Sequence, residues 1–78
     1  MLRRVEPTAG ARFRARLEKV RSHVARLPAE QQSEFLPMVD EVDVQFQRRQ
    51  SDPALIRRLM EDLRFIAKSV QFELEVLC

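Results

Sequence analysis

Apolar residues recur every three or four positions in three segments of the chain, and this spacing is typical of one face of an α-helix. The segments cover residues 10–27, 30–49 and 52–78. Pro28 ends the first segment, because a proline disfavours helical backbone in the residue before it. Polar residues 47–51 separate the second segment from the third. The pattern predicts an all-α protein: a small antiparallel three-helix bundle, up-down-up, as a single domain of residues 1–78.

The third segment predicts a long C-terminal helix that carries most of the apolar surface. Asp52 is a preferred N-cap residue, and Pro53 suits the first helical position because its missing N–H would be unpaired there anyway. One broad face of this helix collects the following residues: Leu55, Ile56, Leu59, Met60, Leu63, Ile66, Ala67, Val70, Leu74 and Leu77. A stripe of this width can pack against two other helices.

A second apolar stripe, formed by Phe65, Phe72 and Val76, lies on the opposite side of the same helix. In the first half of the helix that side carries Arg58 and Glu61, so only the C-terminal half is apolar on two sides. A helix that is apolar all round is normally buried all round. Three interpretations stay open: the N-terminal arm covers this stripe, the stripe binds a partner or a second copy, or its residues are isolated exposed side chains without a role.

The first two helices each carry a narrower apolar seam. The seams consist of Phe13, Leu17, Val20, Val24 and Leu27 in the first helix and Phe35, Val39, Val42 and Phe46 in the second. Pro37 falls inside the second helix, where it removes a backbone hydrogen bond and crowds the preceding turn, so we expect a kink or a split there. Residues 42–46 also alternate with the period of a strand, but a lone strand would have no partner in this chain. The expected core joins both seams to Ile56, Leu59, Leu63, Ile66 and Val70.

The first residues do not resemble a targeting segment. Residues 1–9 are expected to form a flexible N-terminal arm, because Pro7 and Gly10 discourage regular structure, with Thr8 as the N-cap of the first helix. The basic start is not followed by the apolar core of a signal peptide. No apolar run approaches the roughly 20 residues of a membrane span. These features, together with the presence of only one cysteine, favour a cytoplasmic protein.

The small size of the chain points to an external source of stability. A chain of 78 residues buries only about 60% of its unfolded surface, and such chains usually rely on disulfides, a metal or oligomerisation. One cysteine excludes an internal disulfide, and one histidine with one cysteine does not make a usual zinc site, so no metal or cofactor is expected. We therefore expect a homo-oligomer or a subunit of a hetero-complex.

Charge is unevenly distributed: residues 1–27 carry eight Lys or Arg against two acids, whereas residues 28–78 carry six against ten. The cations of the first helix therefore lie against acids of the other two helices, contact phosphates of DNA or RNA, or bind an acidic protein or a membrane surface. The cations available for an anionic partner are Arg12, Arg14, Arg16, Lys19 and Arg21. The acids expected to pair with them inside the chain are Glu34, Asp40, Glu41, Asp43, Asp62 and Glu73.

Nucleic-acid binding has little further support in the sequence. The chain has no Trp and no Tyr, and Phe13, the one aromatic residue of the basic region, lies on the core seam. The helix that follows the turn at Pro28 is acidic and would repel phosphate. Nucleic-acid binding is therefore the alternative rather than the first hypothesis.

Residues suited to catalysis are scarce, and we do not expect an enzyme. His23 stands alone on the first helix, and Cys78 is not part of a prenylation box, although its thiol could crosslink two chains under oxidising conditions. Asp40, Glu41 and Asp43 are close in sequence, but paired carboxylates need a cleft to shift their pKa values.

The first functional hypothesis is a non-enzymatic protein–protein interaction or oligomerisation module. It binds through the apolar face of the C-terminal helix, with Phe65, Phe72, Val76 and Leu77 as contact residues. One alternative is a small nucleic-acid-binding regulator that uses the Arg-rich first helix. Another is a small adaptor, chaperone or inhibitor subunit of a larger complex.

Overall fold

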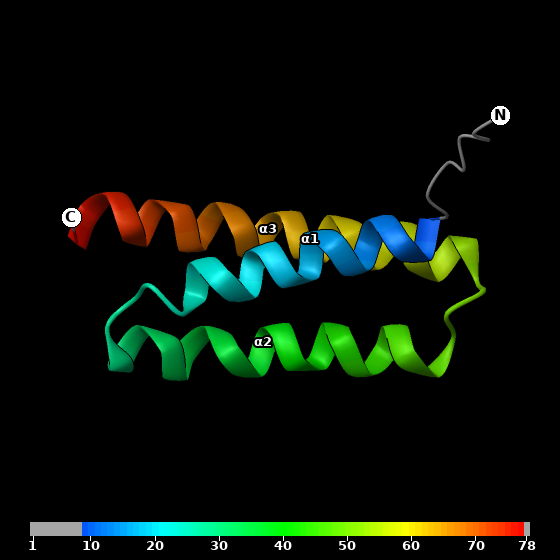
Figure 1. The fold of residues 1–78 in the computed structure, drawn as a ribbon, viewed down its shortest axis with the longest axis horizontal. Coiled ribbons are helices and arrows are strands. Elements are labelled where there is room, and N and C mark those ends of the chain that lie inside the picture. The colour runs from blue at the N-terminus through cyan, green and yellow to red at the C-terminus, as the bar shows by residue number, and fades with distance from the viewer. Residues whose placement is uncertain (1–8, 78) are drawn as a thin grey trace, which may run out of the picture.

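Figure 1 shows the computed structural model of this protein, which describes residues 9–77. Helix α1 covers Ala9–Val24, α2 covers Ala29–Arg48 and α3 covers Pro53–Leu77, and each helix packs against the other two. α1 and α3 run in the same direction, α2 runs in the opposite direction, and α3 extends beyond the end of α1 (Figure 1). The predicted up-down-up three-helix bundle with a long C-terminal helix is confirmed. Residues 1–8 of the predicted arm, which include the Thr8 cap, and Cys78 lie outside the described residues, whereas Ala9, predicted to end the arm, is the first residue of α1.

The core of the bundle is formed by the predicted seams. Its buried side chains are Phe13, Leu17, Val20, Val24, Leu27, Phe35, Val39, Val42, Phe46, Ile56, Leu59, Leu63, Ile66 and Val70. The rings of Phe13 and Phe46 pack with their centroids 4.6 Å apart, which joins α1 to α2. No polar or charged residue is buried within residues 9–77. Each large apolar side chain buried in this way contributes about 1.5–3 kcal/mol, so this dry core is the main source of stability.

Asp52 caps the start of α3, as the sequence predicts. Its Oδ1 accepts hydrogen bonds from the backbone N–H groups of Ala54, at 3.1 Å, and Leu55, at 3.3 Å. The Asp52 carbonyl accepts the first backbone hydrogen bond of the helix, from the N–H of Ile56 at 3.0 Å. Two of the N–H groups that every helix start leaves unpaired are thereby satisfied, and Pro53 occupies the first helical position.

The turn between α1 and α2 departs from the prediction, because α1 ends at Val24 instead of Leu27. Leu27 is nevertheless buried, and its N–H donates to the Val24 carbonyl at 3.0 Å. The side-chain amide of Gln32 donates to the carbonyl of Leu27, at 2.7 Å, and to that of Ala25, at 3.2 Å. A side chain of α2 therefore satisfies two carbonyl groups of the turn that follows α1, and this helps to fix the two helices as antiparallel neighbours.

Helix α2 continues without a break through Pro37, so a split, one of the two predicted outcomes, is excluded. Pro37 cannot donate to the carbonyl of Ser33, but both residues are exposed and water can reach that carbonyl. The buried neighbours Phe35 and Val39 keep the core-facing side of the helix intact. Residues 42–46 are helical as predicted, with Val44 exposed to solvent.

The cap at Asp52 gives a first prediction. Replacement of Asp52 by Ala leaves two N–H groups at the start of α3 without their acceptor, and we expect it to reduce the free energy of unfolding by about 1 kcal/mol. Urea unfolding followed by circular dichroism measures this difference. Ser51→Ala, one position earlier and outside the cap, serves as the control and should change stability by much less. Equal stabilities of the two variants would contradict the role of the cap.

Candidate interaction surface

The second apolar stripe of α3 lies on the surface of the bundle. Phe65 is 69% exposed, and Phe72 and Val76 are each 62% exposed. Phe65 and Phe72 are seven residues apart, which places them on the same side of α3 and about 10 Å apart along its axis. The core is complete without them, so their apolar area is left for another contact. The interpretation that residues 1–8 cover this stripe falls outside the described part of the chain.

Met38 of α2 adds to this surface. It is 42% exposed and lines, with Phe65 and Phe72, a shallow hollow of about 530 Å³ between α2 and α3. The polar residues around this hollow are Glu34, Lys68, Ser69 and Glu73. We refer to Met38, Phe65, Phe72 and Val76 together as the apolar face. An apolar centre with a polar rim is the usual composition of a protein–protein interface.

Leu77, the fourth predicted contact residue, belongs to a different side of α3. It continues the core stripe, but it lies in the last turn, where α3 extends past the end of α1 (Figure 1). No neighbouring helix covers it fully, and it is 47% exposed. Leu77 therefore borders the apolar face only at the C-terminal end of α3.

The predicted cations of α1 do not form one patch, and Arg21 is used inside the bundle. Its Nη2 atom lies 3.0 Å from Oδ1 of Asp40 and 2.9 Å from Oδ2 of Asp43, so it connects α1 to α2. Partial burial lowers the pKa of Arg21, but the hydrogen bonds and the charges of Asp40 and Asp43 together raise it by more, so the net shift is upward. Within the described residues, no other acid pairs with a cation of α1. Of the predicted acids, Glu34, Glu41, Asp62 and Glu73 make no ion pair with a residue between 9 and 77.

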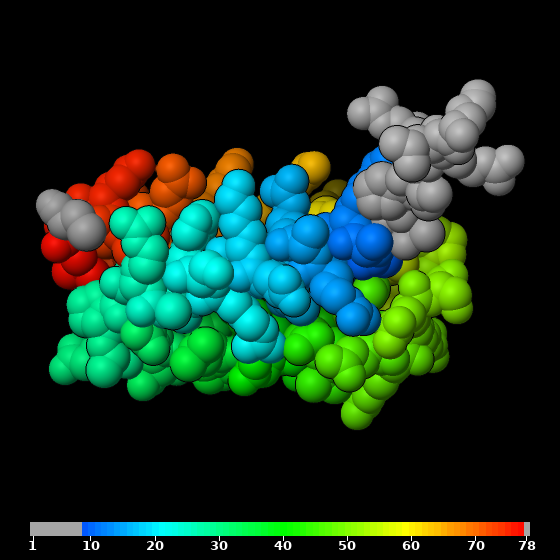
Figure 2. Space-filling model, in the orientation of Figure 1, coloured from blue at the N-terminus to red at the C-terminus, as the bar shows by residue number. Residues whose placement is uncertain are grey.

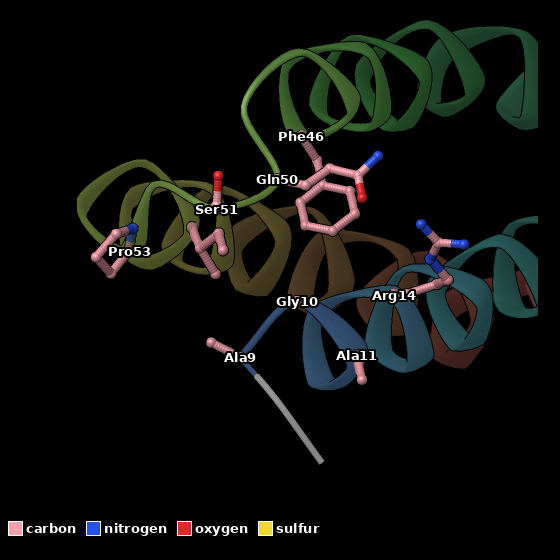
Figure 3. Close-up of a pocket in the computed structure, with 9 residues that line it drawn as sticks. Ala9, Gly10, Ala11, Arg14, Phe46, Gln50, Ser51 and Pro53 are labelled. Carbon is pink, nitrogen blue, oxygen red and sulfur yellow. The ribbon is translucent and has the colours of Figure 1, made fainter.

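Arg14 lies on the same flank of α1, close to the start of the helix. Its guanidinium carbon is 5.9 Å from the centroid of the Phe46 ring, within the range of a cation–π interaction. Arg14 and Phe46 line a hollow of about 690 Å³ at the end of the bundle, where α1 begins near the turn between α2 and α3 (Figure 3). Arg14 is the one charged side chain among the described residues that line it. This cation therefore contacts the bundle itself.

The other three cations, Arg12, Arg16 and Lys19, point to the opposite flank of α1. They are exposed, and none makes an ion pair with any residue between 9 and 77. All three line a groove between α1 and α3, which Arg64 of α3 lines as well. Sequence analysis missed Arg64 in this group, because only the packing of α3 against α1 brings it to the groove.

No family model, curated protein or solved structure matches this chain. Among residues 9–77, no group of three His, Cys, Asp or Glu residues could hold a metal ion. No helix within the same range is long and apolar enough to cross a membrane. The fold and the surface together define a small three-helix bundle with an exposed apolar face and a separate cationic groove.

The contact of Arg21 with two aspartates gives a second prediction. Arg21→Gln should reduce the free energy of unfolding by up to about 1 kcal/mol at low salt, because Arg21 and Asp40 remain accessible to water and their attraction is screened. In 1 M NaCl the difference should shrink, since salt at about this concentration screens charges beyond roughly 3 Å. Urea unfolding at both salt concentrations checks it. Arg16→Gln, on the other flank, is the matched control, and an equal loss in the two variants would contradict the proposed role of Arg21.

Proposed function

We propose that this protein is a non-enzymatic protein–protein interaction module that associates through the apolar face, with a second copy of the same chain as its partner. The observation that carries the proposal is the exposure of Phe65 and Phe72 beside a core that is complete without them. Aromatic residues are enriched in the centres of protein interfaces and contribute much of their binding energy. A chain of this size also gains stability from association, because its single cysteine cannot form a stabilising disulfide within the chain.

The arrangement of the two phenylalanines favours a second copy of the chain over an unrelated protein. A twofold axis that passes between Lys68 and Ser69 would place two α3 helices antiparallel. Phe65 of each copy would then lie opposite Phe72 of the other, because the two residues are equidistant from that axis. The same patch serves both subunits in such an interface, which is the commonest arrangement of soluble homo-oligomers.

The area of the apolar face predicts a weak dimer. A fully exposed Phe presents on the order of 200 Å², so Phe65 and Phe72 together expose roughly 250 Å² at the fractions observed. With Met38 and Val76 the face reaches about 400 Å² per chain, within the range of functional surface patches. Two such faces and their polar rims approach the roughly 1,200 Å² at the lower limit of specific interfaces. We therefore expect a dissociation constant in the micromolar range.

Two other hypotheses make different use of the surface. An adaptor, chaperone or inhibitor subunit would place another protein on the apolar face, and the chain alone would then remain a monomer. A nucleic-acid-binding regulator would use the cations of α1, but Arg21 is paired with Asp40 and Asp43 and Arg14 contacts Phe46. The cytoplasm is the location that we propose, on the basis of the single cysteine and the lack of a long apolar run in the sequence.

The proposal is tested by the double variant Phe65→Ser, Phe72→Ser. Serine and phenylalanine have similar helix propensities, so the exchange removes apolar area with little effect on α3 itself. We expect the variant to keep its helical circular dichroism and to lose dimer formation, with at least a tenfold higher dissociation constant. Size-exclusion chromatography with light scattering measures the mass of both proteins at matched concentrations.

Val44→Ser is the control for this experiment, because Val44 is an exposed apolar residue of α2 outside the apolar face. It should leave the dimer unchanged. If the double variant unfolds, Phe65 and Phe72 belong to the core and the proposal fails. It fails equally if the double variant remains folded and dimerises as strongly as the unmodified chain.

A further inference from the structure

The groove between α1 and α3 carries cationic side chains on both of its edges. Arg12, Arg16 and Lys19 stand on the α1 edge, and Arg64 stands on the α3 edge. Arg57 extends the α3 edge, since it lines an adjoining hollow together with Arg12. In Figure 2, α1 lies across the front of the molecule in blue to cyan, and α3 follows its upper border in yellow to orange. This groove is on a different flank of α3 from the apolar face.

The floor of the groove is apolar. Ala15 and Met60 line it between the two cationic edges, and Met60 is half-buried against the core. No acidic residue lines the groove or the adjoining hollow within the described part of the chain. In cross-section the surface is therefore cationic, apolar and again cationic.

The two flanks of α1 differ in how their charge is balanced. On the flank toward α2, Arg21 is neutralised by Asp40 and Asp43 at hydrogen-bonding distance. On the flank toward α3, Arg16 and Arg64 have no carboxylate partner within residues 9–77. Cations that line one groove repel each other and attract anions to it. The unbalanced flank is thus the side on which an external anionic partner is favoured.

We propose that this groove binds an acidic amphipathic helix of a partner protein. The apolar seam of that helix would rest on Ala15 and Met60, and carboxylates on its two sides would meet the two cationic edges. A fourth helix in a groove between two packed helices continues the packing of the bundle, at the usual axis separation of about 8–10 Å. Arginine is suited to this role, because its guanidinium forms paired hydrogen bonds with a carboxylate.

The spacing of the cations matches a helical partner. Arg12, Arg16 and Lys19 follow each other at intervals of four and three residues, and Arg57 and Arg64 are seven residues apart. Each edge therefore extends over about 10 Å, or two helical turns. Glutamates placed at the same intervals on each of two sides of a helix in the groove can face both edges at once.

A nucleic acid fits this groove less well than an acidic helix. Phosphates would balance the cations of the edges, but they leave the apolar floor without a contact. Single-stranded nucleic acids usually stack their bases on aromatic side chains, and no aromatic residue is among the described residues that line the groove. The combination of cations with an apolar floor therefore favours a protein partner.

The probe that tests this proposal is a synthetic helical peptide of about 18 residues, long enough to form a helix. It carries leucines at intervals of three and four, with glutamates on both sides of the leucine seam. A peptide of the same composition in scrambled order is the reference. Fluorescence anisotropy should show micromolar binding of the amphipathic peptide, at least tenfold weaker binding of the scrambled peptide, and weakening of both by salt.

The charge-reversal variant Arg16→Glu, Arg64→Glu should lose at least tenfold in affinity for the amphipathic peptide. Arg48→Glu, Arg58→Glu is the matched control, because it changes the net charge equally at two exposed positions outside the groove. The milder pair Arg16→Gln, Arg64→Gln should also weaken binding, and it replaces the reversal if circular dichroism shows that the latter unfolds. Phe65→Ser, Phe72→Ser should bind the peptide normally, so that this proposal and the dimer proposal are tested separately.

Four results would overturn the proposal. The first is equal binding of the amphipathic and scrambled peptides, and the second is an equal loss in the groove variant and its control. The third is tighter binding of random-sequence duplex DNA or single-stranded RNA than of the peptide at the same salt concentration. The fourth is a low-salt oligomer of the chain that Arg16→Glu, Arg64→Glu abolishes, since this would assign the groove to a second copy.

Discussion

Each helix carries one stripe of apolar side chains, and none of these stripes can be buried without the other two helices. The helices are 16 to 25 residues long, and in proteins most of the stability of such helices comes from the packing of their apolar faces rather than from helix propensity. The stripe of α3 is the widest, and it supplies the fully buried Leu59 and Leu63. The cap at Asp52 fixes the start of α3, and Gln32 holds the turn between α1 and α2, but both act on elements that the shared core holds in place.

The core leaves the apolar face and the cations of the groove at the surface, where they can contact other molecules. α3 is central to this arrangement, since one side of it is buried and two other sides face solvent with different chemistry. Phe65 and Phe72 make one exposed side apolar, whereas Arg57 and Arg64 make another cationic. The two surfaces are separate, so a dimer through the apolar face would leave the groove of each copy open to a further helix.

The fold was predictable because it depends on patterns that are local in the sequence: apolar spacing, an Asp-Pro helix start and the turn at Pro28. The end of α1 at Val24 was not, because the turn that follows it is held by hydrogen bonds from Gln32, a residue of another helix. The composition of the surfaces was predictable only in part. Met38 belongs to the apolar face and Arg64 to the groove between α1 and α3 because of how each helix is rotated against its neighbour. The periodicity of the sequence does not define this rotation. For the same reason, the sequence did not distinguish Arg21, which faces α2, from cations that face α3.

The most direct test of the account is the solution mass of the unmodified chain. Analytical ultracentrifugation in reducing buffer, from low to high micromolar concentration and at low and high salt, would measure it. The account predicts a mass that rises from monomer to dimer with concentration and is largely insensitive to salt, because the buried area between the copies is apolar. A folded monomer at every concentration would contradict self-association through Phe65 and Phe72.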